Sequence, residues 1–173
     1  MEIFEHANTW TEHFNSGWLN HLDTTGEIDW KQYQYVRNHS AINAPGLDPA
    51  RARLLLVSTA GAYIRGQQPA FNAAAPRGDY SIRTFPVTTP FADLDYAHDH
   101  YDHAARQQDP RVNLPLNYLA EMVTRGNLGS MTESVVSFSG YHPDARSVVD
   151  EMVPEILQVA EKEQAQAALL VPV

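Results

Sequence analysis

The sequence predicts an α/β fold with a three-layer, parallel or mixed sheet of the Rossmann-like kind, preceded by an irregular N-terminal extension. The first observation is a set of short apolar runs at residues 53–59, 133–138 and 167–173, which are typical of buried strands. The second is that segments with helical features lie between these runs. Strand, crossover helix and strand in alternation indicate a sheet with helices on its faces.

The composition indicates a single cytoplasmic domain. A chain of 173 residues that is 43% apolar can bury one core. No apolar run approaches the roughly 18 residues that a membrane helix needs, and the first residues lack a signal-peptide pattern. A formal charge of −9 without a basic cluster disfavours nucleic acid and anionic membranes as partners. The absence of cysteine excludes disulfides, thiolate metal sites and a thiol nucleophile within these residues.

The chain divides by pattern into residues 1–47 and residues 48–173. In the first segment aromatic and polar residues mix without a long period, so we expect short helices that pack on a core built elsewhere. The second segment is the expected α/β domain. Its last apolar run lacks the polar tail usual at a natural end, so we expect this domain to be incomplete at its carboxyl end.

Small residues follow the first strand, which we expect at residues 53–59 after a turn-rich segment. Ser58, Thr59 and Gly61 stand where that strand ends, and open α/β sheets bind ligands at the carboxyl ends of their strands. We therefore assign these three residues to a substrate site. Close packing is the alternative explanation of the small side chains, and no glycine-rich nucleotide motif is present.

A second strand is expected at residues 80–87, where apolar residues alternate. At its entry Asp79, Ser81 and Arg83 supply a carboxylate, a hydroxyl and a guanidinium, which together could bind a zwitterionic amino acid. A surface ion pair on an edge strand is the alternative. Residues 88–114 are expected to be mainly loop.

That loop contains the densest group of ionisable residues, three histidines, two aspartates and a tyrosine within residues 98–103. We assign catalysis to His98, His100 and Asp102 and substrate binding to Tyr101, because a neutral imidazole near pH 7 can protonate a leaving group. A divalent metal is an alternative, since an extended His-x-His pair places both rings on one side. A solvated loop is another, and we assign no metal ligands.

Two helices are expected in the second half of the chain. Residues 115–126 have proline near the start, apolar residues at helical spacing and Gly126 at the end. A later helix begins with Asp144 as its cap and carries an apolar stripe to Ala160. Pro154 lies within that stripe and should kink or split the helix.

Several segments, in order, resemble the selenoprotein B family of glycine, sarcosine, betaine and D-proline reductases. The most distinctive are Leu55-Leu-Val-Ser-Thr-Ala-Gly-Ala-Tyr-Ile-Arg-Gly, Gly78-Asp-Tyr-Ser-Ile-Arg and His98-Asp-His-Tyr-Asp. Further matching segments lie at residues 113–119, 126–129 and 137–140. The resemblance covers about residues 53–173 and is closest to the D-proline-reductase-like members.

The resemblance implies reductive cleavage of a C–N bond in an amino acid or related amine. The family uses a selenocysteine or cysteine as nucleophile and a dithiol as reductant, and such a motif would directly follow Val173. Other reductase subunits or a homo-oligomer would be the protein partners. Two alternatives stay open at this point: a noncatalytic binding or partner module of the same fold, and a His/Asp metalloenzyme that acts without a thiol.

Overall fold

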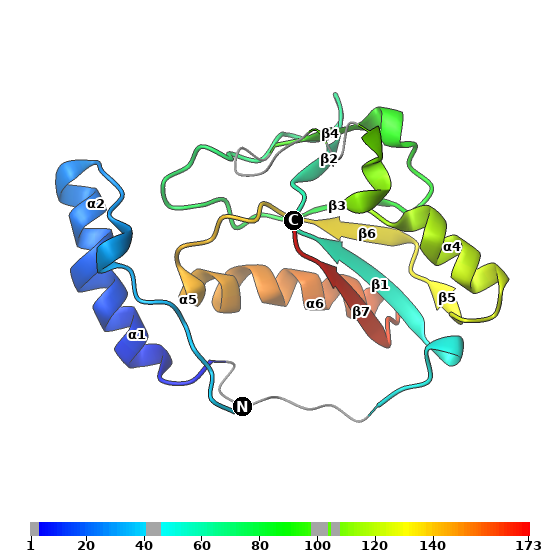
Figure 1. The fold of residues 1–173 in the computed structure, drawn as a ribbon, viewed down its shortest axis with the longest axis horizontal. Coiled ribbons are helices and arrows are strands. Elements are labelled where there is room, and N and C mark those ends of the chain that lie inside the picture. Colours follow the sequence, from blue (N-terminus) through cyan, green and yellow to red (C-terminus); the bar gives the residue numbers. More distant parts are fainter. Residues whose placement is uncertain (1–3, 41–45, 98–103, 105–107) are drawn as a thin grey trace.

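The computed structural model describes residues 4–40, 46–97, 104 and 108–173 and shows a mixed α/β fold (Figure 1). β1 (Arg53–Ser58) is the central strand, with β6 (Ser134–Ser137) parallel to it on one side and β7 (Ala167–Val171) parallel on the other. β5 (Ser130–Met131) pairs with the start of β1. β3 (Arg83–Pro86) is antiparallel to β6. The prediction of an α/β fold with a mixed sheet is therefore confirmed.

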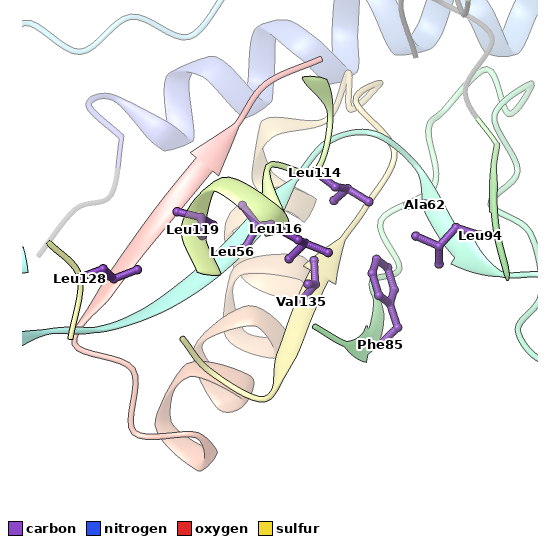
Figure 2. Close-up of a cluster of buried hydrophobic side chains, with 9 residues drawn as sticks. All are labelled: Leu56, Ala62, Phe85, Leu94, Leu114, Leu116, Leu119, Leu128 and Val135. Carbon is purple, nitrogen blue, oxygen red and sulfur yellow. The ribbon is translucent and has the colours of Figure 1, made fainter. Parts of the chain in front are cut away.

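The central strand is buried on both faces, as its continuous apolar run predicts. On one face Leu56 packs in a cluster with Phe85, Val135 and the helix α4 (Leu116–Thr124), as Figure 2 shows. On the other face Leu55 and Val57 pack with side chains of α6 (Val153–Lys162). Alternate residues of one strand thus serve two separate apolar clusters.

Both predicted helices are present. α4 starts directly after Pro115, and its end is followed by Gly126 in the left-handed region, with φ of 74°. Asp144 caps α5 (Ala145–Ser147) by accepting hydrogen bonds from two backbone N–H groups. A π-helical turn, Val148–Met152, connects α5 to α6, and Pro154 lies in the first turn of α6. The helix is therefore interrupted, as expected, but by the π-helical turn that precedes Pro154.

Two expectations about residues 80–114 need correction. The strand expected at residues 80–87 is shorter, because residues 80–82 belong to the turn built around Asp79. The segment expected to be mainly loop also contains a short strand, β4 (Leu94–Tyr96), which pairs antiparallel with β2 (Ala62–Ile64) in a second, small sheet. Strands of three residues are too short for a period of two to be recognised.

The N-terminal segment forms short helices, as expected. α1 (Ala7–Phe14), a π-helical turn and α2 (Asn20–Thr25) follow one another along one side of the molecule (Figure 1). Their buried side chains form a separate, mainly aromatic cluster that includes Trp10, Phe14 and Trp18. Ala145 and Val149 of the second segment pack against this cluster. The division at residue 47 stays a prediction.

None of the helices in the described part of the chain is long and apolar enough to cross a membrane.

Candidate ligand site at the carboxyl edge of the sheet

Four strands place one residue each in a row at the carboxyl ends of the parallel strands. The register pairs Arg83 of β3 with Ser137 of β6, Ser137 with Ser58 of β1, and Ser58 with Val171 of β7. Two predicted site residues, Ser58 and Arg83, therefore lie at the same edge although 25 positions separate them in the sequence. This edge is where open α/β sheets bind their ligands.

The two serines of this row are fully buried, and their hydroxyls hold neighbouring loops. Ser58 Oγ donates a hydrogen bond to the carbonyl oxygen of Asn113 at 2.9 Å. Ser137 Oγ accepts one from the backbone N–H of Ala62 at 2.8 Å. The geometry gives both serines a positioning role, since their hydroxyls fix the segments that enter and leave the edge.

Replacing Ser58 with alanine is expected to lower the free energy of unfolding by about 1–3 kcal/mol, because the buried hydrogen bonds of its hydroxyl to Asn113 and Ala60 are lost. Urea unfolding followed by circular dichroism measures the change. Ser16→Ala is the matched control, because that serine is exposed on the N-terminal helical segment. Equal stability of the two variants would contradict the positioning role of Ser58.

Thr59 and Gly61 bring two further segments to the same edge. Gly61 has φ of 65°, a left-handed conformation that turns the chain out of β1 and towards β2. Its carbonyl oxygen accepts a hydrogen bond from the N–H of Ala97 at 2.9 Å. Thr59 Oγ1 accepts one from the N–H of Val173 at 2.8 Å. Residues far apart in the sequence thus meet at the end of β1.

The predicted catalytic residues His98, His100 and Asp102, together with Tyr101, lie outside the described residues. Both flanks of their segment are described. The chain enters it from Ala97, which is bonded to Gly61, and it leads back to Asn113, which is bonded to Ser58. Ala97 and Asn113 are therefore both bonded to residues at the carboxyl end of β1.

Asp79, Ser81 and Arg83 are brought together by direct hydrogen bonds. The Ser81 hydroxyl and its N–H both donate to Asp79 Oδ1, the N–H at 3.0 Å. Arg83 Nη1 donates to Ser81 Oγ at 2.9 Å, and the guanidinium carbon lies 4.4 Å from the ring centroid of Phe71. The three predicted residues thus form one connected polar group whose guanidinium is held over an aromatic face.

The pKa of Asp79 is lowered although its partial burial acts to raise it. Hydrogen bonds from the Ser81 hydroxyl, from the N–H of Asn72 and from the N–H of Ser81 favour the charged form, and Arg83 adds a favourable charge. Asp79 is therefore an ionised carboxylate at neutral pH. It is the anionic member of a polar group in which Ser81 links the carboxylate to Arg83.

A pocket of 450 Å³ opens beside this group. Glu151 and Glu155 line it together with Asp79, Tyr80 and Ser81. Three carboxylates facing one space favour a cationic group, such as the ammonium of an amino acid. Within the described residues, no group of three histidine, cysteine, aspartate or glutamate side chains is close enough to hold a metal ion.

His142 also contacts this group, and the sequence patterns did not identify it. Its Nε2 lies 3.0 Å from the carbonyl oxygen of Asp79, so Nε2 carries the proton and donates it. Burial against Tyr80 and Phe138 lowers the pKa of His142 below its usual value, outweighing the hydrogen bond and the charge of Asp79, which raise it. The imidazole is therefore neutral at pH 7.

This shift predicts a pH dependence of stability. In the unfolded chain His142 binds a proton near its ordinary pKa of 6.5, whereas the folded chain binds it only at lower pH. Stability is therefore fully present above pH 6.5 and falls as the pH drops through the folded pKa. Glutamine does not titrate, so the free energy of unfolding of His142→Gln should fall less than that of the parent chain between pH 7 and about 5. This range lies above the ordinary pKa values of carboxylates.

Urea titrations at several pH values measure this effect. His13→Gln is the control, because His13 is an exposed histidine of α1. If His142→Gln and the parent chain lose stability in parallel over this range, burial of His142 is not the cause.

Comparison of the chain with protein-family models finds no match, and neither does comparison with curated proteins or with solved structures.

Proposed function

We propose that the chain is the substrate-binding part of a selenoprotein-B-like reductase subunit that cleaves the C–N bond of an amino acid or related amine. The observation that carries the proposal is the meeting of three separate segments at one edge of the sheet. They are the end of β1 with Gly61, the polar group of Asp79 and Arg83, and the flanks of the histidine segment. These are the segments on which the resemblance rests.

The charges at this edge suit a zwitterionic ligand. The guanidinium of Arg83 is the proposed group for the carboxylate. Its Nε donates to the carbonyl oxygen of Pro69, and its Nη1 donates to Ser81 Oγ and to the carbonyl oxygen of Ile82, so Nη2 is the nitrogen that would donate to the ligand. Asp79, with Glu151 and Glu155 along the same pocket, is the group for the amine. Ser81 links the two ends because it bonds both Asp79 and Arg83. Hence the ligand would lie along this polar group.

In the proposed reaction a selenolate or thiolate attacks the carbon that bears the nitrogen, and the C–N bond breaks. The nitrogen takes the bonding electron pair and a proton, for which His98 or His100 is the proposed donor. This attack leaves the carbon bonded to selenium or sulfur. A dithiol then gives up two electrons and two protons and becomes a disulfide: the Se–C or S–C bond breaks, the carbon takes one proton to form a C–H bond, the second proton goes to solvent, and the selenolate or thiolate is regenerated. The nucleophile would be a selenocysteine or cysteine outside these 173 residues, which contain no cysteine.

The proposal also covers the location of the protein, the layers around its sheet and its partner surface. We propose a cytoplasmic protein with a Rossmann-like, three-layer arrangement around its sheet. The outer side of β7 is the proposed contact with other reductase subunits or with a second copy. Its Leu170 is 68% exposed, and Leu157 of α6 is 54% exposed. Exposed apolar residues beside an open strand edge are typical of a surface that a partner covers.

A noncatalytic binding module is the second candidate, and one observation favours it. The 173 residues contain no cysteine, so they carry the proposed ligand groups without a nucleophile. Such a module would bind the amino acid and leave the redox step to another protein. Both candidates would therefore bind the ligand at the same site, but only the reductase would cleave it.

Binding is tested first, with the chain as it stands. Isothermal titration with D-proline, glycine, sarcosine and betaine should find one ligand that binds and whose affinity falls at least tenfold in Arg83→Ala. Arg125→Ala is the control, because Arg125 forms an exposed ion pair on α4 with Glu121. Retained affinity in Arg83→Ala, or binding of none of the four ligands, would contradict the site.

Turnover then separates the two candidates. The protein purified from its own host is assayed for dithiothreitol-dependent release of amine from the ligand that binds. The reductase proposal expects turnover that falls about 100-fold or more in His100→Ala, since general acid catalysis contributes 100-fold or more. Unchanged turnover in His100→Ala would remove the role of the histidine segment, and binding without turnover would favour the noncatalytic module.

A further inference from the structure

A second pocket, of 420 Å³, lies between the N-terminal segment and the loop that follows β6. Aromatic side chains form most of its wall: Trp30, Tyr33, Tyr35, Tyr141 and His142. It shares no lining residue with the pocket beside Asp79. No lysine, arginine, aspartate or glutamate lines it, so its wall is mainly aromatic faces and edges.

The rings stand nearly at right angles to one another, as the walls of a box do. Trp30 and Tyr141 have an interplanar angle of 89° with centroids 6.1 Å apart. Trp30 and Tyr33 meet at 74°, and Tyr33 and Tyr35 meet at 77°. This arrangement presents several aromatic faces and edges to one open hollow.

Hydrogen bonds from their hydroxyls fix two of these rings. The hydroxyl of Tyr33 donates to the carbonyl oxygen of Pro143 at 2.8 Å, and that of Tyr141 donates to the carbonyl oxygen of Pro76 at 3.0 Å. Trp30 begins a 3-10 turn that Asp29 caps. The box is therefore held in shape without a ligand, which reduces the entropy lost on binding.

Two of the rings are open to solvent. Trp30 is 47% exposed and Tyr35 is 65% exposed, so aromatic surface is available at the pocket. Large exposed aromatic residues that gather around a hollow are typical of a binding site rather than of a core.

The electrostatics of the pocket favour a cation. The faces of tryptophan and tyrosine rings carry negative potential and attract positive charge. The pKa of Tyr33 is raised to about 12, first by burial and then by Tyr35 and the carboxylate of Asp144, so its ring is neutral and negative charge lies close by. The chain as a whole has a formal charge of −9, which adds a favourable long-range field.

We propose that this aromatic pocket binds a quaternary or highly methylated ammonium group. A primary ammonium needs acceptors for its three protons, whereas the wall consists mainly of aromatic faces and edges. The hydroxyls of Tyr33 and Tyr141 already donate to the backbone carbonyls of Pro143 and Pro76. A methylated ammonium needs no acceptors and gains from both apolar contact and the ring potential. The inference does not rest on the proposed reductase function.

The test compares two ligands of the same shape that differ in charge. Choline and its neutral isostere 3,3-dimethylbutan-1-ol are titrated into the chain at constant ionic strength, with tryptophan fluorescence and isothermal titration as readouts. We expect choline to bind with a Kd in the millimolar range or below and at least fivefold tighter than the isostere. Equal affinity would overturn the proposal and leave an apolar pocket only.

Substitutions of pocket residues test whether choline binds in the aromatic pocket. Trp30→Leu and Tyr35→Leu are each expected to weaken choline binding about fivefold or more, as measured by isothermal titration. Tyr118→Leu is the matched control, because Tyr118 is 50% exposed on α4 and its ring already contacts the guanidinium of Arg111. If Trp30→Leu fails to fold, Trp30→Phe serves in its place and should show a smaller loss. Unchanged affinity in Tyr35→Leu together with either Trp30 variant would overturn the proposal.

Discussion

Replacing Phe85 with alanine is expected to lower the free energy of unfolding by about 3–5 kcal/mol. Phe85 is 1% exposed and lies in β3, in the apolar cluster between the sheet and α4 (Figure 2). Val135 of the adjacent strand and Leu116 of α4 belong to the same cluster. Removal of the ring leaves a cavity that these side chains can fill only in part, which adds to the lost transfer free energy.

Urea unfolding followed by circular dichroism measures this loss. Thr84→Ala is the control on the same strand, because Thr84 is exposed and its loss should change stability by less than about 0.5 kcal/mol. Phe85→Leu keeps most of the apolar volume and should lie between the two. If Phe85→Ala costs no more than Thr84→Ala, the cluster does not carry the stability that its burial implies.

Long apolar runs and clear helix signals were sufficient to predict four of the five strands of the main sheet, but not the two-residue strand β5. β1, β7 and α4 were expected within a few residues of their observed bounds because each has a pattern that spans its full length. β2 and β4 were not predicted. Each has only three residues and forms a strand through its pairing with the other. The π-helical turn before Pro154 was also beyond prediction, since it depends on how the two helices pack.

The candidate site was predictable where its residues are close in the sequence. Asp79, Ser81 and Arg83 alternate along one short segment, so their contact follows from local geometry. The bonds from Ser58 to Asn113 and from His142 to Asp79 join segments more than 50 residues apart. No local pattern encodes such bonds. A serine at the end of each of two parallel strands, Ser58 and Ser137, was the available signal for the buried row.

Gly78→Ala is expected to be the second most damaging of the substitutions considered, with a loss of about 3–4 kcal/mol in the free energy of unfolding. Gly78 has φ of 83°, a conformation that costs an alanine about 1–2 kcal/mol. A Cβ atom there would also lie 2.6 Å from the backbone oxygen of Tyr141 and 3.2 Å from Cδ of Pro143. These contacts cannot be relieved by a side-chain rotation alone, so the backbone must move.

Gly66→Ala separates the two causes, because Gly66 has φ of 72° and a Cβ there would meet no atom within 4 Å. Thermal unfolding of both variants should show a loss of about 1–2 kcal/mol for Gly66→Ala, from backbone strain alone. The excess loss in Gly78→Ala then measures the close approach of the Asp79 turn to the Tyr141 loop. Because Gly78 lines the pocket beside Asp79 and Tyr141 lines the aromatic pocket, the excess should be accompanied by weaker binding at both. Equal losses in the two variants would show that the two loops can separate at no cost, and that neither pocket depends on their contact.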